Sequence, residues 1–375
     1  MEETAKQGPS DREHLLHVLR GWLAGRWPAA ADIAIDDLGG PSATGFSNDT
    51  VFFRARWQEQ GHAREGRYVA RIEPTETPVY PPQTTVSMAS VEVQYRIMQA
   101  IATHSNVPLA ALIGYEADPG PLGRPFYVMG FVEGQVPTDW PRYTQEGFLV
   151  DEATPAQRRR LVESGIEVLT RIHRIDWKQA GLDWLVPHGK TPGLRWQIDL
   201  YRDNARAELR GRAHPILDQA FAWLETHFPG ESDHLGISWG DARLGNMIFR
   251  DYECVAVTDW EAVALGPPEL DLGWWLMFDR FIHESSGVTT RMDGMPTRAE
   301  QRAYYASQVG RYLGDTHYFE VFGATRFTAV MIRTMDRMTK TGMMPPEMNA
   351  GVHNVATQVL ADLLGIPYNW TDPPR

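Results

Sequence analysis

The stretch Trp239-Gly240-Asp241-Ala242-Arg243-Leu244-Gly245-Asn246 indicates both the fold and the chemistry of this chain. It places a carboxylate and a carboxamide five residues apart, at Asp241 and Asn246. A short apolar strand, residues 255–257, follows and runs into a second carboxylate, Asp259, eighteen residues after Asp241. An Asp, an Asn five residues later and a strand that ends in another Asp form the layout of a phosphoryl-transfer site.

Each of these residues has a predicted role in such a site. Asp241 would accept a hydrogen bond from the attacking hydroxyl group and take its proton, while Asn246 and Asp259 would hold magnesium through hard oxygen atoms. Gly245 is expected to supply a backbone angle that other residues resist. Asp and Asn are also common in ordinary turns, but the combination with Gly240 and Gly245 favours the functional interpretation.

The segment resembles the catalytic loop of the aminoglycoside phosphotransferase family, which also includes choline-kinase-like and homoserine-kinase-like enzymes. That loop is His-Gly-Asp, four residues, then Asn; here Trp239 replaces the His and Arg243 stands where a second His is common. The Gly-Asp-x-Arg-Leu-Gly-Asn form is similar to the branch related to the kinase domain fused to some acyl-CoA dehydrogenases. A Gly-x-Pro-x-x-Asp-Leu pattern follows at residues 266–272, and the resemblance implies that its Asp271 braces the site.

Two N-terminal features also resemble the family. Gly45-Phe46-Ser47-Asn48-Asp49-Thr50 is similar to its phosphate-covering loop, in which Ser47, Asn48 and backbone N–H groups would bind phosphate oxygens. A plain hairpin turn is the alternative for this loop. Arg71 stands where kinases have the strand lysine that binds the α- and β-phosphates; it keeps the charge and adds a planar fork. A solvent-facing strand arginine is the alternative.

The remaining nucleotide contacts are also implied by the resemblance. Arg71 would pair with a residue of the following helix, either Glu92 by its charge or Gln94 by its register. Residues 126–134 resemble the interlobe linker, so backbone groups near Met129 and Phe131 would bind the adenine edge. An ordinary apolar core strand is the alternative for the linker.

Hydrophobic spacing predicts a smaller, strand-rich N-terminal part and a larger helical part. The predicted helices are 12–27, 87–103, 154–175, 194–209 and 215–227, and the predicted strands are 51–57, 67–72 and 126–129. The polar segment 58–66 is expected to join the first two strands, and Thr154 to cap its helix ahead of Pro155. The resemblance implies an α+β, two-lobed protein-kinase-like fold: an N-lobe at residues 1–130 with the nucleotide-covering loop, and a C-lobe at 131–375 with the catalytic loop, metal ligands and acceptor pocket.

Composition excludes several classes of protein. A formal net charge of -12 argues against a nucleic-acid partner. The one cysteine, Cys254, cannot form an internal disulfide and is expected to be a buried structural thiol in a reducing compartment. Residues 1–12 are polar and no run of about 18 apolar residues occurs, so we expect a cytoplasmic chain with no membrane segment.

The leading hypothesis is therefore a small-molecule kinase that uses ATP and Mg²⁺ to phosphorylate a hydroxyl acceptor. The alternative is a catalytically weak nucleotide-binding module, or pseudokinase, because Trp239 and Arg71 depart from the commonest pattern. A protein kinase is disfavoured, since only residues 260–266 separate Asp259 from a Pro-Pro pair. The acceptor stays open between an aminoglycoside and another hydroxylated metabolite or acyl-CoA-like compound. A late methionine run is either core filling or an adaptable acceptor wall: Met331, Met335, Met338, Met343, Met344.

Overall fold

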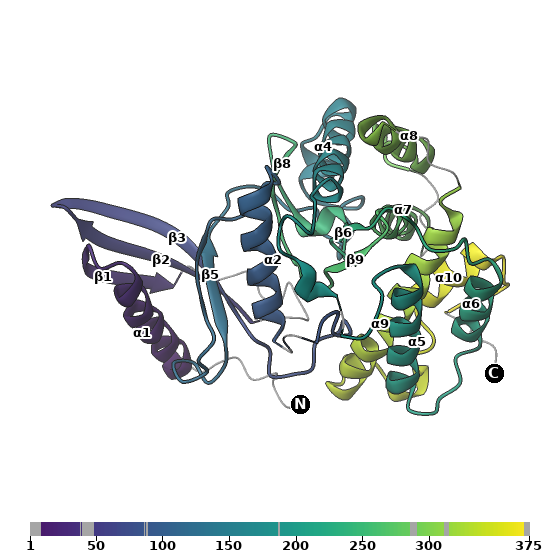
Figure 1. The fold of residues 1–375 in the computed structure, drawn as a ribbon, viewed down its shortest axis with the longest axis horizontal. Coiled ribbons are helices and arrows are strands. Elements are labelled where there is room, and N and C mark those ends of the chain that lie inside the picture. The colour runs from purple at the N-terminus through teal and green to yellow at the C-terminus, as the bar shows by residue number, and fades with distance from the viewer. Residues whose placement is uncertain are drawn as a thin grey trace. The chain divides into compact units, whose positions relative to one another are not determined.

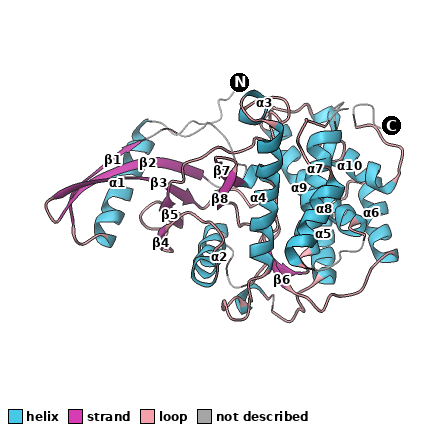
Figure 2. Cartoon of the chain, turned by 90° about the horizontal axis from the view of Figure 1, so that it is seen from above, coloured by secondary structure: helices cyan, strands magenta, loops and turns pink. Residues whose placement is uncertain are grey.

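The computed structural model describes residues 9–37, 39, 49–85, 87, 89–186, 188–285, 291–310 and 315–370. The chain divides into two compact units. The first comprises Met1–Pro78, Ala89–Arg96 and Ala110–Val132, and the second comprises Val79–Met88, Ile97–Leu109 and Glu133–Arg375. Strands dominate the first unit and helices the second (Figure 2). Ser47 and Asn48 of the predicted phosphate loop lie outside the described residues.

The first unit is built on an antiparallel sheet with strand order β1-β2-β3-β5-β4 (Figures 1 and 2). The strands are β1 (Ala30–Asp37), β2 (Asp49–Glu59), β3 (His62–Ile72), β4 (Leu112–Glu116) and β5 (Phe126–Gly130). The prediction of a joining segment at 58–66 is wrong, because β2 and β3 continue to a two-residue turn at Gln60 and Gly61, both with positive φ. This end of the hairpin is largely exposed, so its strands lack the apolar alternation by which a strand is recognised.

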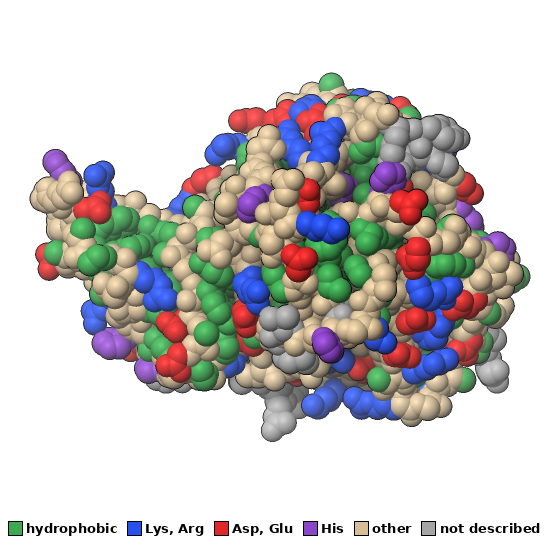
Figure 3. Space-filling model, viewed as in Figure 1, with side chains coloured by type: hydrophobic (Ala, Val, Ile, Leu, Met, Phe, Trp, Pro, Cys, Tyr) green, Lys and Arg blue, Asp and Glu red, His purple; other side chains and the backbone are tan. Residues whose placement is uncertain are grey.

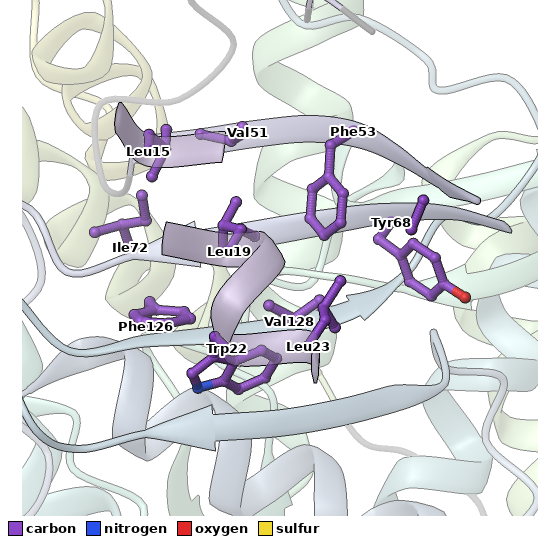
Figure 4. Packing of buried hydrophobic residues seen from close by; sticks show 12 residues of the cluster. Leu15, Leu19, Trp22, Leu23, Val51, Phe53, Tyr68, Ile72, Phe126 and Val128 are labelled. Carbon is purple, nitrogen blue, oxygen red and sulfur yellow. The ribbon is translucent and has the colours of Figure 1, made fainter. Parts of the chain in front are cut away.

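Helix α1 (Pro9–Arg26) covers one face of this sheet and forms the core of the first unit (Figure 4). Its Leu15, Leu19, Trp22 and Leu23 pack against alternate residues of three strands: Val51, Phe53, Ala55, Tyr68, Ala70, Ile72, Phe126, Val128. Because successive strand residues point to opposite faces, the residues between them belong to the other face. That face carries Phe52, Val69, Arg71 and Met129, so the core packing determines which side of the sheet the candidate nucleotide residues occupy.

The second unit is mainly helical and contains two small antiparallel sheets. One pairs β6 (Gly236–Ser238) with β9 (Ala264–Gly266), and the other pairs β7 (Met247–Arg250) with β8 (Glu253–Val257). Its longer helices are α4 (Pro155–His173), α5 (Leu194–Leu209), α6 (Pro215–Thr226), α7 (Glu269–Glu284), α8 (Arg298–Val309), α9 (His317–Lys340) and α10 (Val355–Leu364). The predicted start of α4 is confirmed: Thr154 and Gln157 form a reciprocal capping box, with Pro155 at the first helical position. Helix α2 (Ser90–His104) contributes residues to both units.

The packing of α7 against α9 fixes the part of the fold that supports the site. A Cβ atom on Gly273 of α7 would overlap the backbone of Phe319, and one on Gly323 of α9 would lie 3.3 Å from the Cα atom of Trp274. Glycine at both positions lets the two helix backbones approach closely. The methionine run at the end of α9 and beyond it is mixed, because Met335 of the helix is buried whereas Met343, which follows the helix, is exposed.

The single cysteine is a structural residue, and the charged side chains on the face seen in Figure 3 are mixed in sign. Cys254 is buried and its backbone N–H donates to Ser164 Oγ; burial raises the pKa of its thiol to about 12, so the structural role is confirmed. Acidic and basic side chains are interspersed on the face seen in Figure 3, so the negative charge is not gathered there into one patch. Within the described ranges, no helix has the length and apolar composition needed to cross a bilayer.

The N-cap of α6 predicts a pH-dependent stability. His214 is buried, accepts a hydrogen bond on Nδ1 from the Leu217 N–H, and has no partner on Nε2 among the described residues. Desolvation lowers the pKa of His214 from 6.5 to about 4. Between pH 6.5 and pH 4, His214 is therefore protonated in the unfolded chain but neutral in the folded chain. This difference should lower the free energy of unfolding by about 3 kcal/mol as pH falls from 6.5 to 4.

The variant His214→Asn isolates this contribution, because Asn also caps helices but does not titrate. Urea unfolding of both proteins between pH 4 and pH 7.5 should give a flatter stability curve for the variant. Parallel curves would show that His214 is not the titrating group.

Candidate active site

The structure brings Asp241 and Asn246 into direct contact. Strand β6 (Gly236–Ser238) leads into the loop, and a single 3-10 turn, Leu244–Asn246, returns the chain toward Asp241. Asn246 Nδ2 donates to the backbone oxygen of Asp241 at 3.0 Å and to its Oδ2 atom at 2.8 Å. The amide group is thereby oriented with its nitrogen on Asp241, which leaves its oxygen as the atom to offer to a cation.

The other carboxylate oxygen of Asp241 accepts two hydrogen bonds. Arg243 Nε and Trp274 Nε1 each donate to Oδ1 at 3.0 Å. Arg243 also forms an ion pair with Asp139 and lies over the ring of Phe278. Sequence reasoning missed Trp274, because it lies 33 residues from Asp241 on another element.

The environment of Asp241 favours its neutral form more than water does. Its side chain is buried, and desolvation together with the negative charge of Asp259 raises its pKa to about 7. The hydrogen bonds from Asn246 and Trp274 act in the opposite direction but do not outweigh burial. A carboxylate with a pKa near neutrality is suited to exchange a proton at physiological pH.

Asp259 follows β8 (Glu253–Val257), as predicted, in a left-handed backbone conformation with φ of 57°. Its Oδ1 atom is buried and has no hydrogen-bond partner among the described residues. The backbone around it is fixed twice: Trp239 Nε1 donates to the carbonyls of Thr258 and Asp259, and the Thr258 N–H donates to the Asn246 carbonyl. A buried carboxylate oxygen without a donor is suited to a cation.

The oxygen donors of Asn246 and Asp259 fit magnesium, which is commonly held by one or two protein side chains together with substrate phosphates. Throughout the described part of the chain, no three His, Cys, Asp or Glu side chains gather into a metal site. Further oxygen ligands beside Asn246 and Asp259 would come from substrate and water.

The two glycines of the loop are needed for different reasons. Gly240 has φ of 91°, and a Cβ atom there would overlap the carbonyl oxygen of Ala262. The expectation of an unusual backbone angle at Gly245 is wrong, because its φ is not positive. A Cβ atom on Gly245 would instead lie 2.8 Å from a carboxylate oxygen of Asp139, so this glycine supplies space.

Asp271, at the start of α7, braces the loop as expected. Its carboxylate accepts the backbone N–H of Trp239 at 2.7 Å, that of Gly240 at 2.8 Å and the Ser238 hydroxyl at 2.8 Å. His173 Nε2 lies 3.0 Å from Oδ2, so this imidazole has a structural role beside the brace. Burial raises the pKa of Asp271, but these donors outweigh it and hold the pKa below its usual value.

A buried cation below the loop was also missed. Arg326 of α9 is almost fully buried, and its Nη2 atom donates to the Gly240 carbonyl at 3.0 Å. Its guanidinium carbon lies 4.8 Å from the ring centres of both Tyr201 and Trp274. Nothing local marks this arginine in the sequence, since its role depends on the approach of α9 to the loop.

The candidate phosphate-binding residues of the first unit that the structure describes, and their candidate partners, each contact another residue of that unit. Arg71 Nη1 donates to Thr50 Oγ1 at 3.0 Å, beside the start of β2. Glu92 forms an ion pair with Arg96, and Gln94 is buried and bonds Ser90 Oγ. The pairing of Arg71 with Glu92 or Gln94 stays a prediction.

The linker residues have defined surroundings. Met129 is paired with Val69 of β3 in the sheet register, so both side chains lie on the face that carries Arg71. The Phe131 N–H donates to the Arg67 carbonyl at 2.9 Å, and the Arg67 guanidinium lies over the Phe131 ring. Phe131 could therefore offer only its carbonyl to an adenine edge. Strand alternation would have identified Val69 as a further candidate from the sequence.

A small cavity borders Arg243 and Asp139. Its volume of about 20 Å³ is enough for a water molecule but not for an organic acceptor. The acceptor pocket predicted for this part of the chain therefore stays a prediction.

Residues 41–308 match the sequence model of the phosphotransferase enzyme family (APH), and the chain belongs to this family. It is 28% identical over 242 residues to acyl-CoA dehydrogenase family member 11 of Gallus gallus. That match covers 63% of this chain but only 27% of the relative, so the chain corresponds to less than a third of the relative's length.

Solved structures show the fold. A candidate aminoglycoside phosphotransferase from Ralstonia eutropha matches with a TM-score of 0.69 and 24% identity, covering 93% of this chain and 98% of that one. An APH(2″)-IIIa complex with GDP and kanamycin has a TM-score of 0.54 and 13% identity, covering 93% and 99%. An APH(4)-Ia complex with AMP-PNP and hygromycin B has a TM-score of 0.51 and 13% identity, and the match covers 92% of this chain and 97% of that one. The fold is α+β and protein-kinase-like, as expected.

The brace leads to a prediction about stability. Asp271→Ala removes a buried acceptor and leaves the N–H groups of Trp239 and Gly240 unsatisfied, so we expect a loss of about 3 kcal/mol or more in the free energy of unfolding. The control Asp336→Ala removes a carboxylate that is 34% exposed and paired with Arg212, which should cost less than about 1 kcal/mol. Urea unfolding measures both, and equal losses would contradict the bracing role.

Proposed function

We propose that this protein transfers the γ-phosphoryl group of ATP to a hydroxyl group of a small molecule. The observation that carries the proposal is the contact of Asp241 with Asn246, together with a buried Asp259 oxygen that has no hydrogen-bond donor among the described residues. Membership of the phosphotransferase family supports the reaction class. The nucleotide and small-molecule complexes of the related folds support the two substrates.

Asp241 is the proposed general base. It would accept a hydrogen bond from the acceptor hydroxyl and receive its proton as the oxygen forms a bond to the γ-phosphorus. The bond from that phosphorus to the β–γ bridging oxygen breaks, and ADP leaves with the electron pair. Arg243, bonded to Asp241 and Asp139, keeps a positive charge beside the reacting groups.

Asn246 and Asp259 are the proposed magnesium ligands. Magnesium, when bound, would neutralise phosphate charge as it develops. Both ligands are held in place before the metal binds. Asn246 is held by its hydrogen bond to Asp241, and the backbone of Asp259 is held by the hydrogen bond from Trp239. Pre-oriented ligands lower the entropy that binding must overcome.

The first unit would bind the nucleotide. We assign phosphate contacts to Arg71, Ser47 and Asn48, with Glu92 as the acidic partner of Arg71. The adenine would lie against Met129 and Val69, which share one face of the sheet, and would bond the linker backbone near Met129 and Phe131. ATP is proposed over GTP, and parallel assays with both nucleotides decide between them.

The second candidate is a catalytically weak nucleotide-binding module. It is motivated by the Trp at position 239, where the family has His, and by Arg71. The indole of Trp239 nevertheless bonds the Asp259 carbonyl, so the substitution leaves the metal-binding segment tied to the catalytic loop. Magnesium-dependent ATP binding without turnover over a broad acceptor library would favour this second candidate.

The acceptor screen should contain aminoglycosides, other polyols, hydroxylated metabolites and hydroxyacyl thioesters. We propose only a small molecule with a free hydroxyl group. Transfer of ³²P from γ-labelled ATP to one compound class would identify the acceptor.

Removal of the base should abolish transfer while leaving the nucleotide in place. We expect Asp241→Ala to lower kcat by about 10²- to 10⁴-fold, the usual contribution of a general base, with little change in ATP affinity. Asp203→Ala is the matched control, because that carboxylate is 78% exposed on α5. Full activity in the Asp241 variant would refute the assignment.

Removal of a metal ligand should change the magnesium requirement. Asp259→Ala takes away the charged oxygen donor, so the magnesium concentration for half-maximal rate should rise by about tenfold or more. The measurement is the rate of transfer as a function of magnesium at saturating ATP, with Asp203→Ala again as control. An unchanged magnesium dependence would remove Asp259 from the metal site.

A further inference from the structure

The N-terminal turns of α7 hold both the backbone and the side chain of the catalytic loop. Asp271 bonds the loop backbone at Trp239 and Gly240, and Trp274 bonds the carboxylate of Asp241. Residues three apart lie on the same face of a helix, so one helix face meets the loop twice. The first contact fixes where the loop lies, and the second fixes how its carboxylate is turned.

We propose that Trp274 is a positioning residue that fixes the rotation of the Asp241 carboxylate and so presents Oδ2 to the acceptor hydroxyl. The proposal rests on the proposed function, since it concerns how the base is aimed.

The hydrogen bonds to Asp241 are unequally divided between its two oxygens. Among the described residues, Oδ1 accepts from Trp274 and Arg243, whereas Oδ2 accepts from Asn246 alone. Each carboxylate oxygen has about two lone-pair sites. Oδ1 is therefore filled and Oδ2 retains one site, which makes Oδ2 the atom that can take the hydroxyl proton.

Of the two donors on Oδ1, Trp274 is the rigid one. Its side chain is almost fully buried, its ring packs 5.2 Å from that of Phe278 and 6.0 Å from that of Phe327, and Arg326 lies over it. Arg243 has a flexible side chain that is 21% exposed and shares its charge with Asp139. An indole held on several sides can maintain one carboxylate orientation, whereas an arginine with a second partner can leave.

The neighbouring tryptophan provides a matched control. Trp275 is equally buried on the same helix, but its indole donates to Gln301 Oε1 at 2.6 Å rather than to Asp241. Changing either tryptophan to Phe removes one buried indole N–H and keeps an aromatic ring. Only Trp274→Phe releases the base.

The kinetic experiment compares Trp274→Phe and Trp275→Phe with the wild-type protein. We expect kcat to fall on the order of tenfold in Trp274→Phe, the effect of losing one hydrogen bond to a charged group. KM for ATP and for the acceptor should stay within about twofold, because the indole is almost fully buried and so is not expected to contact either substrate. Trp275→Phe should keep kcat while showing a similar fall in melting temperature. Equal kcat values in all three proteins would overturn the proposal.

A spectroscopic experiment tests the contact without relying on turnover. The protein is labelled with 5-fluorotryptophan, and the ¹⁹F resonances of Trp274 and Trp275 are assigned, among 13 tryptophans, by their loss in the two Phe variants. Asp241→Ala should move the Trp274 resonance and leave that of Trp275 in place. If Trp274→Phe does not fold, Trp274→Tyr serves for the assignment, and the response of the Trp274 resonance to Asp241→Ala then decides the proposal.

The two experiments separate the possible failures. If the wild-type protein shows no turnover but its Trp274 resonance still responds to Asp241→Ala, the proposed function is refuted and the contact between Trp274 and Asp241 is supported. A working kinase in which that resonance does not respond would sink the inference alone.

Discussion

The buried carboxylate of Asp271 is the interaction on which the rest of the site depends. It sits under the catalytic loop without exposure to water and receives hydrogen bonds from two backbone N–H groups, a hydroxyl and an imidazole. Desolvating a carboxylate is costly unless its lone pairs are occupied. The loop can therefore take few other paths, because any displacement of Trp239 or Gly240 would leave both the acid and their N–H groups unsatisfied.

The Trp at position 239 illustrates how a departure from a family pattern can preserve a contact. The family has His here, and an indole is larger and cannot change its protonation state. Its N–H nevertheless bridges the carbonyls of Thr258 and Asp259, which joins the loop to the second acidic segment. The ring is fully buried against Trp260, so the extra volume is accommodated in the core. The sequence departure therefore gives no physical reason to expect an unsupported site.

Local signals predicted the elements well where they were strong. The α5 helix and the capped start of α4 were predicted from periodicity, the N-cap and proline, and the loop residues were predicted from the spacing of Asp241 and Asn246. The prediction was wrong at the exposed end of the β2–β3 hairpin, because polar strands carry no hydrophobic alternation. Strand β4 was not predicted at all.

The residues missed in the site share one property, which is that they act across distant parts of the chain. Trp274 and Arg326 reach the loop from 33 and 86 residues away. Each looks like an ordinary helix residue in the sequence, and Arg326 even interrupts an apolar run. Gly245 was interpreted correctly as necessary but for the wrong cause, since the nearby Asp139 carboxylate could not be foreseen.

The short segment from Asp271 to Trp274 unites these separate observations. Asp271 holds the loop backbone, Gly273 lets α9 approach, and Trp274 holds the carboxylate. The approach of α9 is what brings Arg326 under the Gly240 carbonyl and against the Trp274 ring. Because buried polar networks are strong when complete and costly when partly satisfied, a change at any one of these positions should propagate to the others. The orientation of the Asp241 carboxylate thus depends on the packing of α7 against α9 and not on the loop alone.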